Sequence, residues 1–183
     1  MKYPLGIGIL IMSLFLMTSI IMVYAQMETT NMTNMTSPTT LGNNELSLSI
    51  GELIVESKTQ SEGMKISNID KQEFEISWSG NATLQIDIPV WDSGTVWTSL
   101  KDDGYWYGKG YGMLIALDNS VAKYTFSTIG KMDDDGKIRN LGSVTFDTND
   151  TGSLSILKNT IGVLADEIDQ QGNAITKIWK LNR

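Results

Sequence analysis

The sequence predicts an all-β protein built as a single antiparallel β-barrel of roughly 8–10 strands, with a β-sandwich as the second choice. Two observations lead to this prediction. From residue 46 onward, apolar and polar residues alternate with a period of two, as in strands with one buried face. Clusters of Gly, Asn and Asp separate these runs at regular intervals, as short turns require. A closed barrel is preferred because closure leaves no exposed strand edge.

Residues 1–25 have the pattern of an export signal. A single positive charge at Lys2 precedes an uncharged apolar run from Leu5 to Val23, and small residues stand at Val23 and Ala25. We therefore expect a signal peptide cleaved after Ala25. The run is also long enough to cross a bilayer, so a retained transmembrane anchor is the alternative. Both alternatives predict an extracellular or cell-surface protein, which contacts the membrane through this segment if the segment is not cleaved.

Residues 26–45 are rich in Thr, Asn, Ser and Met and nearly free of charge, which predicts a flexible stalk. Two glycosylation sequons begin in this stalk, at Asn31 and Asn34. Two more begin further along the chain, at Asn81 and Asn149. We expect N-linked glycans at these positions.

Residues 46–183 form the predicted barrel domain. Within its first strand, the apolar residues move from even-numbered to odd-numbered positions. Leu48 and Ile50 share one parity and Leu53 and Val55 the other, so a β-bulge at Gly51 would let both sets face inward.

The next two apolar runs predict a β-hairpin. Alternation runs through Phe74, Ile76 and Trp78 and then from Leu84 to Val90, and residues 79–81 (Ser-Gly-Asn) are expected to form the turn between them.

The stretch WYGKGYGML, residues 106–114, places glycine at every second position. Gly108, Gly110 and Gly112 therefore share one face of a strand with Trp106. A phosphate-binding loop would lead into a helix, whereas this run leads to a turn at Asp118–Asn119. We expect the glycines to let the strand coil and to leave room for an aromatic ring from a neighbouring strand.

Two further turns are predicted, at Asp133–Gly136 and at Gln171–Asn173. The segment from residue 153 to 168 fits two short strands, which we favour, but also a short helix in the mouth of a barrel.

A set of glycines and aromatic residues between positions 75 and 179 carries a family resemblance: Glu75–Trp78, Ser93–Thr95, Asp103–Gly104, Tyr107–Gly112, Gly142–Ser143, Phe146, Gly152, Leu154, Gly172–Asn173 and Lys177–Trp179. The chain resembles a group of small, uncharacterised archaeal and bacterial proteins with calycin-like or cyclase-like β-barrels. The resemblance implies a calycin-like fold and a stalked, surface-displayed form of it. It implies no activity and no catalytic residue.

Composition excludes several classes of site. The chain has no cysteine and no histidine, which removes disulfides, thiolate nucleophiles, the usual zinc ligands and imidazole bases. Its net charge of −7 argues against a nucleic-acid partner, because phosphate binding needs a basic face. We expect no cofactor.

Two acidic stretches are candidate calcium sites. Asp147, Asn149 and Thr151 stand at alternate positions before Gly152, like the first half of a calcium loop, but Lys158 occupies the position of the bidentate Glu. The second stretch is Asp133–Asp135. An ordinary polar turn is the preferred interpretation of both.

Aromatic residues are also clustered in one part of the sequence, between positions 91 and 111. Trp91, Trp97, Trp106, Tyr107 and Tyr111 are candidate ligand-binding residues, on the expectation that an irregular connection from Asp92 to Asp103 lies over a barrel mouth. Core filling is the alternative interpretation of these side chains.

Three functions remain open. The first is a non-enzymatic module that binds a small apolar or carbohydrate ligand, or a surface partner. The second is an enzyme that uses carboxylates, drawn from Asp87, Asp92, Asp102 and Asp103, together with Tyr. The third is a purely structural, glycosylated envelope protein.

Overall fold

The computed structural model of the protein describes residues 48–85, 87–148 and 152–182. These residues form eight strands and one 3-10 helix: β1 (Ser49–Asn68), β2 (Glu73–Leu84), β3 (Ile88–Leu100), β4 (Tyr105–Ala116), β5 (Val121–Met132), β6 (Ile138–Asp147), η1 (Ser153–Leu157), β7 (Ile161–Ile168) and β8 (Asn173–Asn182). The expected signal or anchor at 1–25 and the stalk at 26–45, with Asn31 and Asn34, lie outside the described residues. Within the described part of the chain, no helix has the length and apolar character to cross a membrane.

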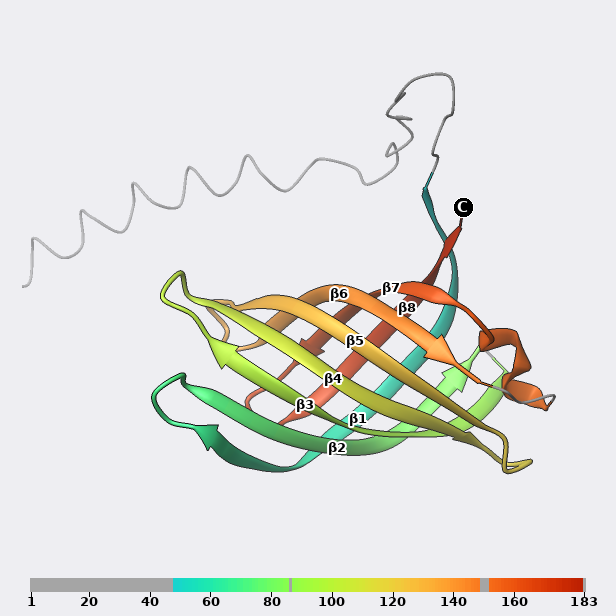
Figure 1. Ribbon diagram of the computed structural model, residues 1–183, viewed down its shortest axis with the longest axis horizontal. Helices are drawn as coiled ribbons and strands as arrows, with labels where there is room; N and C mark the ends of the chain where they lie inside the picture. Colours follow the sequence, from blue (N-terminus) through green and yellow to red (C-terminus); the bar gives the residue numbers. More distant parts are fainter. Residues whose placement is uncertain (1–47, 86, 149–151, 183) are drawn as a thin grey trace, which may run out of the picture. The chain divides into compact units, whose positions relative to one another are not determined.

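The eight strands form one closed barrel in chain order (Figure 1). Each strand pairs antiparallel with the next, and β1 pairs with β8 to complete the cylinder, with Ser49 opposite Asn182. The predicted all-β antiparallel barrel is confirmed, and the strand number lies within the expected range.

One end of the barrel is filled by the apolar core. The 3-10 helix η1 lies at this end, in orange-red at the right of Figure 1. Its Leu154 and Leu157 are 0% and 1% exposed and belong to the same buried cluster as Leu84 and Phe146. The backbone amide of Ser153 donates to Asp118 Oδ2 at 3.0 Å, which ties the start of η1 to the β4–β5 turn. Hydrogen bonds from Ser120 and Ser153 hold the pKa of Asp118 well below its usual range.

The predicted turn at residues 79–81 is wrong. β2 continues through Gly80 to Leu84, and the chain reverses beyond Leu84, where Gln85 has a left-handed backbone with a φ of 47°.

 Gly80 instead marks a close approach between strands, because a Cβ there would lie 2.6 Å from the Cα of Thr59 on β1.

Two other expectations are confirmed only in part. The β1–β8 pairing shifts register between Ile50 and Val55, as a bulge near Gly51 requires. However, Leu48 and Ile50 are 57% and 64% exposed, so the expectation that they face inward is wrong. For the segment from 153 to 168 we favoured two short strands. The second of them is confirmed as β7, whereas the first part of the segment is the short helix η1.

The glycine face of β4 turns into the barrel, as the alternation predicts. Gly112 pairs with Gly94 on β3, and the ring of Tyr124 from β5 lies over Gly112. The ring of Phe126 lies over Gly110 in the same way. The predicted room for neighbouring aromatic rings is therefore confirmed, and the rings pack directly against the backbone of the barrel wall.

Substitution Gly110→Ala is expected to destabilise the barrel by about 1–3 kcal/mol, because the added Cβ would lie 2.5 Å from Cζ of Phe126. Gly63→Ala is the matched control, since a Cβ at Gly63 meets no atom within 4 Å. Urea unfolding of the two variants measures the difference. Equal stability of the two variants would contradict this account of the glycine face.

Candidate functional site

The barrel interior holds a cavity of about 520 Å³. Inward side chains of all eight strands line it, and it extends from the filled end toward the β7–β8 turn, where Gln170 and Gln171 belong to its lining. The alternation that builds the fold therefore also builds the cavity, because every second residue of each strand faces this space.

Aromatic side chains form much of the cavity wall. Trp78 of β2 and Phe126 of β5 have ring centroids 5.8 Å apart in an edge-on arrangement. Phe74 of β2 and Trp106 of β4 have centroids 5.9 Å apart. These pairs give the cavity a predominantly apolar wall that suits flat or aliphatic groups.

A buried acid lies at the inner end of the cavity, toward the core. Both carboxylate oxygens of Asp92 accept hydrogen bonds, one from Ser57 Oγ at 2.7 Å and one from the Tyr124 hydroxyl at 2.5 Å. Burial raises the pKa of Asp92, and the hydrogen bonds from Tyr124, Ser57 and Trp78 offset part of that rise. Burial and the neighbouring Asp92 raise the pKa of Tyr124 as well. This network ties β1, β2, β3 and β5 together across the interior.

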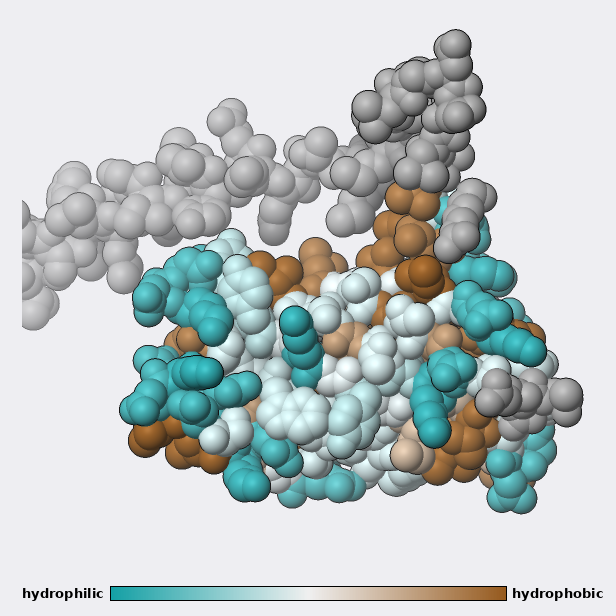
Figure 2. Space-filling view, in the orientation of Figure 1, coloured by the Kyte–Doolittle hydropathy of each residue, from teal (hydrophilic) through white to brown (hydrophobic). Residues whose placement is uncertain are grey.

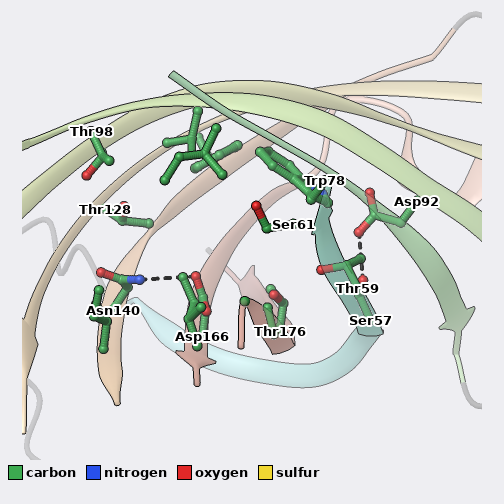
Figure 3. A pocket seen from close by; sticks show the side chains of 18 of the residues that line it. Ser57, Thr59, Ser61, Trp78, Asp92, Thr98, Thr128, Asn140, Asp166 and Thr176 are labelled. Carbon is green, nitrogen blue, oxygen red and sulfur yellow. Dashed lines mark hydrogen bonds between the residues drawn. The ribbon is translucent and has the colours of Figure 1, made fainter. Parts of the chain in front are cut away.

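A second acid, Asp166 of β7, lies across the cavity from Asp92 in the view of Figure 3. Its Oδ2 accepts a hydrogen bond from Asn140 Nδ2 at 3.2 Å. Its Oδ1 is buried and has no hydrogen-bond partner among the described residues. Burial raises the pKa of Asp166 to about 6, and the hydrogen bond from Asn140 offsets only part of the rise.

All the charged residues that line the described cavity are acids. They are Asp92 and Asp166 inside, with Glu62 and Asp169 near the β7–β8 turn, and the described lining contains no Lys or Arg. The cavity therefore offers carboxylates, hydroxyls and the side-chain amides of Asn140, Gln170 and Gln171 as polar partners, and its described lining has no basic group.

The structure does not bring the five candidate aromatic residues together. Trp106 lines the cavity, but Trp91, Trp97, Tyr107 and Tyr111 have the opposite parity and lie on the outer face of β3 and β4. There, Trp97 donates to Glu75 Oε2 at 3.2 Å, and its ring centroid lies 5.6 Å from that of Tyr111. The expected irregular connection from Asp92 to Asp103 is wrong, because most of it is the regular strand β3.

On the face seen in Figure 2, the middle of the barrel wall is mostly near-neutral in hydropathy, and strongly hydrophilic and strongly hydrophobic side chains lie mainly toward the ends. Trp91 and Tyr111 are 46% and 52% exposed on this outer face. Contact of these aromatic residues with a ligand or partner stays a prediction.

The candidate metal ligands are only partly described. Asp147 is exposed at the end of β6, whereas Asn149 and Thr151 lie outside the described residues. The described chain holds no group of three acidic side chains placed to bind a metal. In the other acidic stretch, Asp133 pairs with Arg139 at 2.8 Å, so a cationic side chain of the protein already occupies this turn.

The candidate catalytic carboxylates lie in different places. Asp92 is inside the barrel, Asp87 is exposed in the β2–β3 turn, and Asp102 and Asp103 are exposed in the β3–β4 turn at the other end. They do not form a pair across one site, as glycoside hydrolysis would require. The sequon residue Asn81 is exposed on β2, and its glycosylation stays a prediction, as does that of Asn149, which lies outside the described residues.

Sequence reasoning missed Trp78, Asn140 and Asp166 as site residues. A signal was present, because polar residues stand at inward positions of the alternation: Ser57, Thr59, Asp92, Thr98, Thr128, Asn140, Asp166 and Thr176. A strand that only fills a core would carry apolar residues at these positions.

Comparison with known proteins supports the fold alone. No protein-family model matches the sequence, and no curated protein matches it. Several solved structures are similar, and three of them show the range of the likeness: two are proteins of unknown function and one is described as β-barrel-like.

The first similar structure is a conserved protein of unknown function from Rhodopseudomonas palustris, with a TM-score of 0.60, 9% identity and coverage of 74% of this chain and 98% of that one. The second is a protein of unknown function from Clostridium acetobutylicum, with a TM-score of 0.64, 13% identity and coverage of 76% and 100%. The third is a β-barrel-like protein from Acinetobacter baumannii, with a TM-score of 0.62, 11% identity and coverage of 76% and 99%. The chain thus shares its barrel with uncharacterised bacterial proteins.

Substitution Asp166→Asn is expected to stabilise the protein more at pH 8 than at pH 4. The pKa of Asp166 is raised from 3.8 to about 6 in the folded protein, so the folded state loses stability as the pH rises through this window and the carboxylate becomes charged. The neutral amide removes this loss, which amounts to at most about 3 kcal/mol at about 1.4 kcal/mol per pKa unit. Urea unfolding of both proteins from pH 4 to pH 8 measures it. A stability difference that does not change with pH would contradict a raised pKa at Asp166.

Proposed function

We propose that the barrel is a non-enzymatic binding module that holds a small, largely apolar organic ligand in its interior cavity. The observation that carries the proposal is the combination of a cavity of about 520 Å³ with an aromatic wall and a few inward polar groups. Sites for small molecules have volumes of roughly 300–1,000 Å³ and this same composition.

The cavity is preformed, which favours binding. The closed ladder of strands fixes the positions of the lining side chains, and the buried network around Asp92 holds strands from two sides of the interior. A ligand would therefore bind without a large ordering penalty. Because η1 and the apolar core fill one end, the ligand would enter from the end that carries the β7–β8 turn.

The polar groups of the wall would orient the ligand. Thr98, Thr128 and Thr176 point inward from three different strands, and Figure 3 shows them around the same space as Asp166 and Asn140. Hydroxyl groups of this kind donate and accept hydrogen bonds without adding charge. Such a wall would position one polar end of a mainly apolar molecule.

Substitution Trp106→Ala is expected to weaken binding of the neutral apolar dye N-phenyl-1-naphthylamine by about tenfold, because it removes an aromatic surface from the cavity wall. Trp97→Ala is the matched control: it removes the same side chain from the neighbouring strand, but on the outer face. Titration of the dye fluorescence against each variant gives the dissociation constants.

Two results would contradict the proposal. The first is an absence of saturable dye binding to the unmodified protein. The second is a larger loss of affinity in Trp97→Ala than in Trp106→Ala, which would place the binding surface on the outer aromatic face.

A further inference from the structure

We propose that the ligand of this cavity carries a protonated amine, and that the Asp166 carboxylate is its counter-charge. The inference rests on the binding role proposed above and names the chemical class of the ligand. It is carried by three features of the described residues: the sign of the charges around the cavity, the unpartnered oxygen of Asp166, and the aromatic wall.

The charges around the cavity have one sign. Asp92, Asp166, Glu62 and Asp169 contribute to the described lining, and no Lys or Arg does. A space with low-dielectric walls and acidic groups attracts cations and repels anions. Organic carboxylates and phosphates would enter without a basic partner, whereas an ammonium group would find several acidic ones.

The two interior acids differ in how many of their carboxylate oxygens have hydrogen-bond partners in the protein. Asp92 accepts hydrogen bonds on both oxygens from Ser57 and Tyr124, so it has no need of a further partner. Asp166 is held by Asn140 through Oδ2 alone, which leaves Oδ1 buried without a protein donor. Because a buried carboxylate oxygen without a partner is unfavourable, a charged donor at this point would gain more than one placed elsewhere in the cavity.

The basic residues nearest to Asp166, in the turn before β6 and on β6 and β8, do not supply that donor. Lys137 and Arg139 reach Glu167, which has the opposite parity on β7, at 2.6 Å and 3.0 Å. On β8, Thr176 is the residue paired with Asp166, and the next residue, Lys177, has the opposite parity and is absent from the described lining. The other titratable groups that face the cavity are Asp92, Tyr124, Glu62 and Asp169, which are all acids.

The aromatic wall fits the rest of such a ligand. Trp78 and Trp106 both line the cavity, and indole rings attract a nearby cation through their faces. The apolar surface around them would bury an aromatic or aliphatic body attached to the amine. Asn140, fixed against Asp166, would keep the carboxylate in place.

The inference requires a specific pH dependence. The amine stays protonated at neutral pH, so affinity is expected to be constant between pH 7 and pH 8. The pKa of Asp166 is about 6 in the free protein, so below that pH a proton must leave the carboxyl before the cation binds. Affinity should then fall by up to about tenfold per pH unit.

The test compares three probes of similar size by isothermal titration calorimetry: 4-phenylbutylamine, 4-phenylbutanol and 5-phenylpentanoate. At pH 7.5 the amine is expected to bind at least about tenfold more tightly than the alcohol, and the carboxylate most weakly. In Asp166→Asn the advantage of the amine over the alcohol should disappear while the alcohol keeps its affinity. Asp87→Asn is the matched control, because it removes an equal charge from an exposed position in the β2–β3 turn.

The outcomes separate the two proposals. If the alcohol binds as tightly as the amine, or if Asp87→Asn weakens amine binding as much as Asp166→Asn does, the amine inference is overturned and the binding cavity stands. If none of the probes binds and the dye does not bind either, both proposals fail. Saturable amine binding that is lost in Asp166→Asn and weakens below pH 6 supports the inference.

Discussion

The structure depends on one constraint, which is that a closed eight-stranded barrel must place every second side chain into a space of fixed size. Where an aromatic ring enters that space, the residue facing it must be small. Gly110 below Phe126 and Gly112 below Tyr124 meet this condition. The same complementarity sets where the interior is full and where it stays open, so the cavity follows from the distribution of large and small inward residues along the strands.

Much of the fold could be predicted because strand alternation and turn chemistry are local signals. The reversals at Asp118–Asn119, Asp133–Gly136 and Gln171–Asn173 lie where the turn residues indicated. The prediction failed where a turn residue had another purpose. Gly80 permits a close approach to β1, and nothing local distinguishes that use of glycine from a turn.

Most of the candidate site could not be predicted, because it depends on which parity faces inward. Trp91, Trp97, Tyr107 and Tyr111 are near Trp106 in sequence, yet only Trp106 shares the parity of the cavity. Asp166 and Asn140 meet across a pairing of β6 and β7 that is set by register, and register is a property of the whole sheet. Inward polar residues are therefore a better indicator of a barrel site than the local density of aromatic residues.

The pairing of β1 with β8 has a consequence for how the barrel folds. The other seven strand pairs join neighbours along the chain, and only this closure joins the two ends of the described domain, Ser49 with Asn182. Closure is therefore the step with the largest sequence separation and the highest loop entropy. A circular permutant that links these two ends and opens the chain at the β3–β4 turn would convert this step into a local hairpin, while it preserves every neighbour in the cylinder.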